Sequence, residues 1–329
     1  MPTARLIAQM LKMYGPGVLL LFGLPGNILS YVVMNQAQFR HTTTSYFIRV
    51  LAVCDNGYLI TRCFQRFLLA SFLRPVLIEW NVLRVFCNEY LSMTRFTQAT
   101  SRYVLVLMTY DRLLALLFPL QARAYGVMKV AKILTVIVLL LSFLEGFTYL
   151  FAKYSKIFSH WLCPYYLPGS LGEVYSQYGT ITTFLACGLL IVANVLIAWS
   201  LYSHAQRMKA LQEDHGNHSK IDELQQRSVK NRQISLMLLL VSSFFLLSNF
   251  PREFNVQFWP RHPYSARQYA DLRKMTLEIS IFVEALNYAI NFYLYVASCQ
   301  KFRMTLKRKF LPGVDKKTKT SVTYTTDRD

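Results

Sequence analysis

Four oxygen-bearing side chains lie inside long apolar segments, where a polar group needs a specific reason to be present. Asp55 is in the middle of the run LAVCDNGYL, and Glu284, Asn287 and Asn291 share the last apolar run of the chain. The spacing i, i+3 and i+7 puts the last three on one helix face, so this face is predicted to point into a bundle. Together with Ser101, these oxygens suit water or a small cation, but such a stripe is specific for no ion and also serves packing alone.

Arginines also occur inside apolar segments, in two pairs. Arg62 and Arg66 are spaced i, i+4, and Arg95 and Arg102 are spaced i, i+7, so each pair shares one helix face. Guanidinium groups bind carboxylate or sulfate oxygens through two parallel hydrogen bonds. The sequence therefore predicts a basic cavity that would suit an anionic group.

Glutamates in later apolar segments, Glu145, Glu278 and Glu284, could neutralise part of this cavity. Two interpretations stay open here. Either the charges pair internally and have no ligand role, or Glu278 and Glu284 accept an amine or guanidinium of a ligand, as an amidated Arg-Phe peptide would require. The predicted ligand-binding set comprises Arg62, Arg66, Arg95, Gln98, Arg102, Glu278 and Glu284.

The segment MTYDRLLALLFPL closes a long apolar run with adjacent opposite charges, Asp111 and Arg112. Such a pair can serve simply as an anchor at the membrane boundary. Its separation from Cys87 corresponds to about 37 Å of helix, the length of one tilted span, so the two are expected at opposite membrane faces. Cys163 is expected on the same side as Cys87, where an oxidising compartment would let the two form a disulfide.

These residues must be positioned by membrane helices. The chain has 329 residues, of which 53% are hydrophobic and 16% charged, and its mean hydropathy is +0.27. This composition excludes a soluble enzyme, a collagen, a disordered chain and a small disulfide scaffold. Apolar blocks of spanning length predict an all-α seven-transmembrane helix bundle over residues 1–299. The expected spans are 17–37, 46–70, 84–118, 130–152, 176–206, 231–258 and 272–299.

The net charge is +19, and the Lys and Arg residues gather between apolar blocks and at the C-terminus. This distribution indicates which side of the membrane each loop occupies, and it predicts no nucleic-acid partner. Their bias favours an extracellular N-terminus and a cytoplasmic C-terminus, with Arg252 counted on the outer side. Residues 300–311 predict a short amphipathic eighth helix on an anionic leaflet. Residues 312–329 predict a disordered, Ser/Thr-rich cytoplasmic tail.

An ordered set of motifs resembles the rhodopsin-like, or class A, G-protein-coupled receptors over nearly the whole chain. The motifs are GN at 26–27, LAVCD at 51–55, Cys87, DRLLALLFPL at 111–120, Cys163, Pro251 and NFYLYVASCQKFR at 291–303. Within this family, the NFxLY form of the seventh-helix motif and the QKFR continuation are similar to FMRFamide-like and related invertebrate neuropeptide receptors.

The resemblance implies roles position by position. It implies a polar, sodium-binding and water network at Asn27, Asp55, Ser101, Asn287 and Asn291, with sodium at Asp55 as an allosteric ion. It implies activation and G-protein coupling through Asp111, Arg112, Phe245, Pro251, Asn291 and Tyr295. It also implies the outer disulfide between Cys87 and Cys163.

Three departures from the family pattern put its usual activation switch in question. Leu113 replaces the Tyr of the family's DRY motif, Asn249 replaces the Trp of its CWxP motif, and Phe292 replaces the Pro of its NPxxY motif. Two subclasses are disfavoured as well: Thr94 occupies the position of the monoamine-binding Asp, and Ala285 that of the retinal-binding Lys.

The predicted function is a plasma-membrane receptor, not an enzyme, that binds an extracellular ligand and activates a heterotrimeric G protein. A neuropeptide is the expected ligand, and a small-molecule chemoreceptor of the same fold is the alternative. Arrestin is an expected partner of the tail, and no cofactor other than a sodium ion is expected. In a different class, a transporter or channel would line a path with Asp55, Arg102, Glu284 and Asn291, but the absence of an internal repeat weighs against it.

Overall fold

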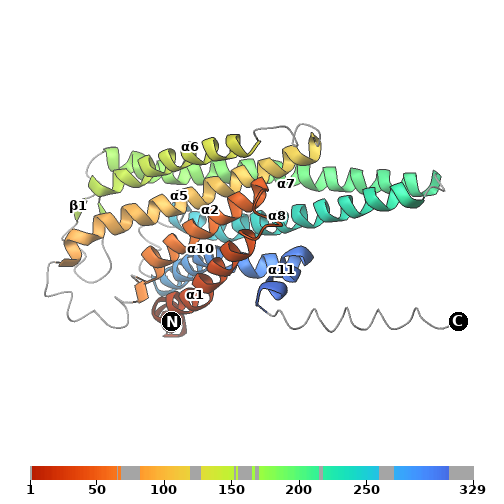
Figure 1. Ribbon diagram of the computed structural model, residues 1–329. Helices are drawn as coiled ribbons and strands as arrows, with labels where there is room; N and C mark the ends of the chain where they lie inside the picture. Colours follow the sequence, from red (N-terminus) through yellow and green to blue (C-terminus); the bar gives the residue numbers. More distant parts are fainter. Residues whose placement is uncertain are drawn as a thin grey trace.

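Long helices lie side by side and dominate the architecture (Figure 1). The computed structural model describes residues 2–64, 66–67, 82–118, 127–151, 153–154, 165–166, 170–214, 218–258 and 270–310. The seven long helices are α1 (Pro2–Met34), α2 (Thr43–Tyr58), α5 (Val82–Leu117), α6 (Val127–Phe147), α7 (Ser170–Asp214), α8 (His218–Phe258) and α10 (Ala270–Ser298). The short helix α11 (Gln300–Phe310) follows α10 and is the predicted eighth helix.

Several helices extend well beyond the apolar blocks that predict them. Helix α1 begins at Pro2 rather than near residue 17, α7 continues to Asp214, and α8 starts at His218. The polar segment between 206 and 232 is rich in Gln, Lys and Arg, which favour helix in water as well as in lipid. Hydropathy therefore marks where a helix meets the membrane surface, not where the helix ends.

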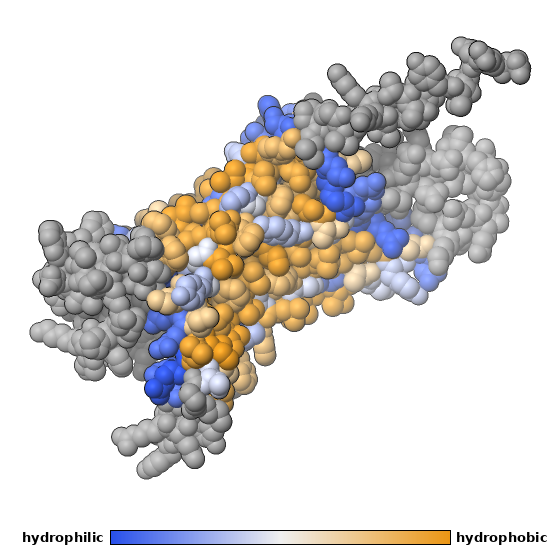
Figure 2. Space-filling view, turned by 90° about the horizontal axis from the view of Figure 1, so that it is seen from below, coloured by the Kyte–Doolittle hydropathy of each residue, from blue (hydrophilic) through white to orange (hydrophobic). Residues whose placement is uncertain are grey.

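The surface carries an apolar belt between two polar ends, as expected of a multi-pass membrane protein (Figure 2). Within the described residues, α1, α6, α7, α8 and α10 are apolar and long enough to cross a membrane. Helix α2 is too short by itself, and the π-helical turn η1 (Leu59–Phe64) prolongs it. Helix α5 carries several charged residues, and these must be satisfied inside the bundle.

Small irregular elements follow α6. A 3-10 turn, η3 (Thr148–Phe151), leads to strand β1 (Lys153–Tyr154), which pairs antiparallel with β2 (Tyr165–Tyr166). These two-residue strands are a minor departure from the all-α prediction. The predicted disulfide lies outside the described residues, because neither Cys163 nor the side chain of Cys87 is among them.

Helices α5 and α6 approach closely at a buried glycine. A Cβ atom added to Gly146 of α6 would lie 2.7 Å from the backbone oxygen of Ser92 and 3.1 Å from the Cβ of Phe96, both in α5. Only a residue without a side chain fits against another backbone at this distance. This contact brings Glu145, the neighbour of Gly146, to the surface of α5.

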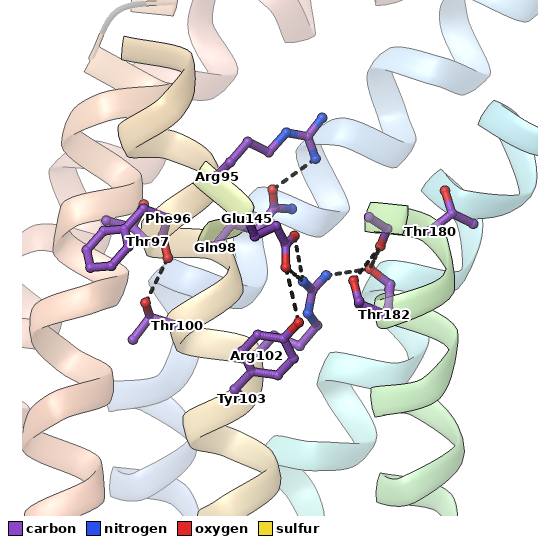
Figure 3. Close-up of polar contacts among 12 residues, drawn as sticks. Arg95, Phe96, Thr97, Gln98, Thr100, Arg102, Tyr103, Glu145, Thr180 and Thr182 are labelled. Atoms are coloured by element: carbon purple, nitrogen blue, oxygen red, sulfur yellow. Dashed lines mark hydrogen bonds and ion pairs between the residues drawn. The ribbon is translucent and has the colours of Figure 1, made fainter. Parts of the chain in front are cut away.

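A buried ion pair joins α5 to α6 just beyond this glycine (Figure 3). The Arg102 guanidinium donates to both carboxylate oxygens of Glu145, at 2.8 and 2.9 Å, and to Thr183 Oγ1 of α7 at 2.5 Å. The Tyr103 hydroxyl donates to Glu145 at 3.1 Å. Arg102 and Glu145 are only 5% and 7% exposed, so each charge depends on the other.

Replacing Gly146 by Ala is expected to lower the melting temperature of the purified chain in lipid nanodiscs. Its Cβ would collide with the α5 backbone, and overpacking of this kind typically costs about 1–3 kcal/mol. Gly188→Ala in α7 is the matched control, because nothing lies within 4 Å of its added Cβ. Equal stability of the two variants would contradict the close α5–α6 contact.

Breaking the Arg102–Glu145 pair from one side is expected to cost about 3–5 kcal/mol, because the remaining charge stays buried without its partner. Arg102→Met and Glu145→Leu should each reduce folded yield and melting temperature. The double variant should recover much of the loss, because two apolar side chains replace two charges. A double variant whose loss equals the sum of the two single losses would show that the charges do not depend on each other.

Candidate ligand and coupling sites

Glu284 is the centre of a charge cluster at the end of the bundle that also holds Arg66. Its Oε1 accepts a hydrogen bond from Gln98 Nε2 of α5 at 2.6 Å, and its Oε2 forms an ion pair with Arg252 Nε of α8 at 3.1 Å. Arg252 also contacts Glu253 at 3.0 Å. Glu284 is 2% exposed, so this one carboxylate ties α5, α8 and α10 together in a water-poor interior.

A second ion pair lies further along α10. Arg66 Nη2 donates to both oxygens of Glu278 of α10, at 2.8 and 3.1 Å. At the extreme end, Arg5 of α1 makes a two-bond contact with Asp271 at 3.1 and 3.2 Å. Arginine at this end therefore fixes α10 against both α1 and the segment that follows η1.

Much of the predicted ligand set is paired internally in the structure, and its ligand role stays a prediction. Arg66 and Arg102 are neutralised by Glu278 and Glu145, and Glu284 is held by Arg252 and Gln98. Arg95 donates to Gln98 Oε1 at 3.4 Å, and both residues project from α5 toward this cluster (Figure 3). Arg62 lies on η1 and is partly buried.

From the sequence, Arg252 was expected on the outer side, and Glu253 was not selected as a site residue. Both charges lie within helix α8, next to Pro251, and Arg252 points into the bundle rather than into an outer loop. The sequence did contain a signal for this arrangement. Two charged residues lie inside the apolar block 231–258, and a charge within a membrane span requires a partner inside the bundle.

Asp55 lies in a separate polar cluster deeper in the bundle. Its Oδ1 accepts from Ser101 Oγ of α5 at 2.6 Å, and its Oδ2 accepts from Asn291 Nδ2 of α10 at 2.7 Å. Asn27 of α1 donates to Asn56 and to the backbone oxygen of Tyr288. The structure therefore brings Asp55, Ser101 and Asn291 into contact, and Asn287 is buried on the same face of α10.

Two oxygens of this region lack a hydrogen-bond donor among the described residues. Both Asn291 Oδ1 and Asn27 Oδ1 are buried and unsatisfied. Unsatisfied oxygens beside a carboxylate suit a water molecule or an oxygen-ligated cation. The ligand atoms that this region offers are carboxylate, amide and hydroxyl oxygens, the type that hard cations prefer over the nitrogen and sulfur ligands of transition metals.

Asp111 and Arg112 lie at the opposite end of α5. Asp111 Oδ2 accepts from Thr43 Oγ1 at the start of α2 at 2.8 Å, and lies 3.5 Å from the Arg112 guanidinium. Arg112 Nε is buried and has no hydrogen-bond partner in the described part of the chain. The pair thus links α5 to α2 while leaving one arginine donor unused.

The family departures have local packing explanations. Asn249 Nδ2 donates to the backbone oxygen of Phe245 at 2.8 Å, near the break that Pro251 makes in the hydrogen bonds of α8. Phe292 packs against Gly26 of α1 and edge-on against Phe302 of α11, with ring centroids 5.9 Å apart. Leu113 is buried in an apolar cluster with α7.

Phe245 and Tyr295 both lie in the main apolar core. They are 2% and 1% exposed, and the Tyr295 ring lies 5.8 Å from that of Phe302. These rings close the interior between the Asp55 cluster and the Arg112 end.

Comparisons with known proteins agree with this architecture. Residues 26–299 match the family model described as 7 transmembrane receptor (rhodopsin family). The somatostatin receptor type 1 of Rattus norvegicus is 27% identical over 237 residues, which cover 71% of this chain and 56% of that receptor. The alpha-1A adrenergic receptor of Cavia porcellus is 34% identical over 105 residues, 32% of this chain and 22% of that receptor.

The fold itself matches a solved structure along nearly its whole length. Squid rhodopsin superposes with a TM-score of 0.71 at 17% identity, covering 99% of this chain and 93% of that one. The chain spans about half the length of the somatostatin receptors it matches, and the narrower resemblance to FMRFamide-like receptors stays a prediction. On the family match and the seven-helix fold together, the chain belongs to the rhodopsin family of seven-transmembrane receptors.

Proposed function

We propose that this protein is a plasma-membrane receptor that binds an extracellular peptide and stimulates nucleotide exchange on a heterotrimeric G protein. The N-terminus is extracellular and the Arg112 end is cytoplasmic in this proposal. The family match supports assignment of the protein to the receptors and argues against a transporter or channel. Somatostatin receptors among the relatives favour a peptide over a small-molecule ligand, as their name indicates.

The mechanism is a population shift between closed and open arrangements of the Arg112 end. A ligand stabilises the open state only by binding it more tightly than the closed state. Helix α8 is the moving element, because Pro251 interrupts its hydrogen bonds between the charge cluster and Phe245. Arg112, with its unused Nε donor, contacts the G protein when α8 moves away. Arrestin binding would use the Ser/Thr-rich residues after 311.

Sodium at Asp55 would stabilise the closed state. Asp55, Ser101 and Asn291 supply oxygen atoms, and the ion would satisfy the unpaired Asn291 Oδ1. A cation at this depth also offsets the buried charge of the Asp55 carboxylate.

Arg112→Ala is expected to retain surface expression but lose most G-protein activation. The measurement is calcium and cAMP signalling in cells with a promiscuous G protein, screened with short peptides, both amidated and with a free C-terminus. Arg40→Ala, an exposed arginine near the same end, is the matched control and should signal normally. Undiminished signalling by Arg112→Ala would contradict the coupling role.

Sodium is expected to raise the melting temperature of the chain in nanodiscs by roughly 2–4 °C over the same concentration of choline, at about ten times its Kd. Asp55→Asn should abolish this difference, because the amide supplies no negative charge. Asp271→Asn, at the rim beside Arg5, should preserve it. A sodium effect that survives in Asp55→Asn would place the ion elsewhere.

A further inference from the structure

The charge cluster at the Arg66 end contains more arginines than acids among the described residues. The arginines are Arg62, Arg66, Arg95, Arg102 and Arg252, and the acids are Glu145, Glu253, Glu278 and Glu284. All four acids contact an arginine in the structure. A surplus positive charge in a bundle interior is unfavourable unless an anion neutralises it.

Arg62 contributes to this surplus. A stacked aromatic pair fixes its position: the rings of Tyr58 and Tyr288 have centroids 3.8 Å apart and are inclined by 22°. Arg62 lies about one turn beyond Tyr58, and Glu284 lies one turn beyond Tyr288 in the same direction, so the two face each other across η1 and α10.

Glu284, however, already contacts two other residues through its carboxylate. Gln98 occupies its Oε1 and Arg252 occupies its Oε2, while Glu278 is engaged by Arg66 through both oxygens. Arg62 forms no ion pair with any acid in the part of the chain that the structure describes. Arg62 also lies four residues before Arg66, and like charges at this spacing on one helix face repel each other.

We propose that Arg62 binds an anionic group of the ligand, of the carboxylate class, above the Tyr58–Tyr288 pair. This inference rests on the proposed receptor function and names the chemistry that the ligand presents. The carboxylate of a peptide C-terminus and that of a small organic acid share this chemistry. An amidated peptide lacks it, and a cationic ligand would have to displace an arginine from Glu278 or Glu284.

Matched acid and amide probes test the proposal in the full chain in lipid nanodiscs. One arm compares N-acetyl-phenylalanine with its amide, as a peptide C-terminus, and the other compares benzoate with benzamide, as a small acid. At about ten times its Kd, an acid is expected to raise the melting temperature by roughly 2–4 °C, and its amide to cause no shift. The arm with the larger shift identifies the source of the carboxylate.

Variants locate the binding group. Arg62→Gln should abolish the shift by the acid, whereas Arg40→Gln, at the opposite end of the bundle, should preserve it. Without probe, Arg62→Gln should melt at or above the wild-type temperature, because it removes an uncompensated charge, while Arg252→Gln should melt lower. Absence of any acid shift, equal shifts by acid and amide, or a shift retained in Arg62→Gln overturns the proposal.

This readout contains no G protein. Acid binding that depends on Arg62, together with absent signalling, would therefore support the anion site and contradict the proposed coupling. Signalling to amidated peptides alone, without acid binding, would support the receptor function and overturn the anion site.

Discussion

A charged group inside a membrane bundle is stable only beside an opposite charge or several hydrogen-bond donors, and this constraint organises the present structure. Two of the buried acids contact an arginine from another helix, Glu145 with Arg102 and Glu284 with Arg252, whereas Asp55 is held by hydrogen bonds from Ser101 and Asn291. These contacts run across the bundle, so they fix the positions of the helices relative to one another. Lipid-facing apolar surface cannot do this, because lipid tails solvate it equally well.

The same constraint connects the ligand end with the coupling end. Helix α8 is held at Arg252 by an ion pair with Glu284, and the adjacent Pro251 removes one of its backbone hydrogen bonds. The same helix contributes Phe245 to the main apolar core. The Asn249 amide caps the Phe245 carbonyl where related receptors carry a tryptophan ring. Under the proposed function, a ligand that altered the charge cluster would act on α8 through its ion pairs and hydrogen bonds.

The sequence predicted the fold well and the site only partly, for physical reasons. Apolar blocks located the spans because burial in lipid requires them, and the stripe of Glu284, Asn287 and Asn291 predicted its inward face correctly. Helix ends were missed because helices such as α1 continue in water. Pairing partners were missed because hydropathy does not say which acid meets which arginine, so Arg252 was counted among the charges of the outer side although it pairs with Glu284 inside the bundle.

A double-mutant cycle on Arg252 and Glu284 tests most directly whether paired charges hold the bundle together. The free energy of unfolding would be measured in nanodiscs for Arg252→Gln, Glu284→Gln, the double variant and the wild type. The account predicts a coupling energy of about 1–3 kcal/mol, with the double variant less destabilised than the sum of the single variants. Additive losses would contradict it, because they would mean that each charge is stabilised without the other.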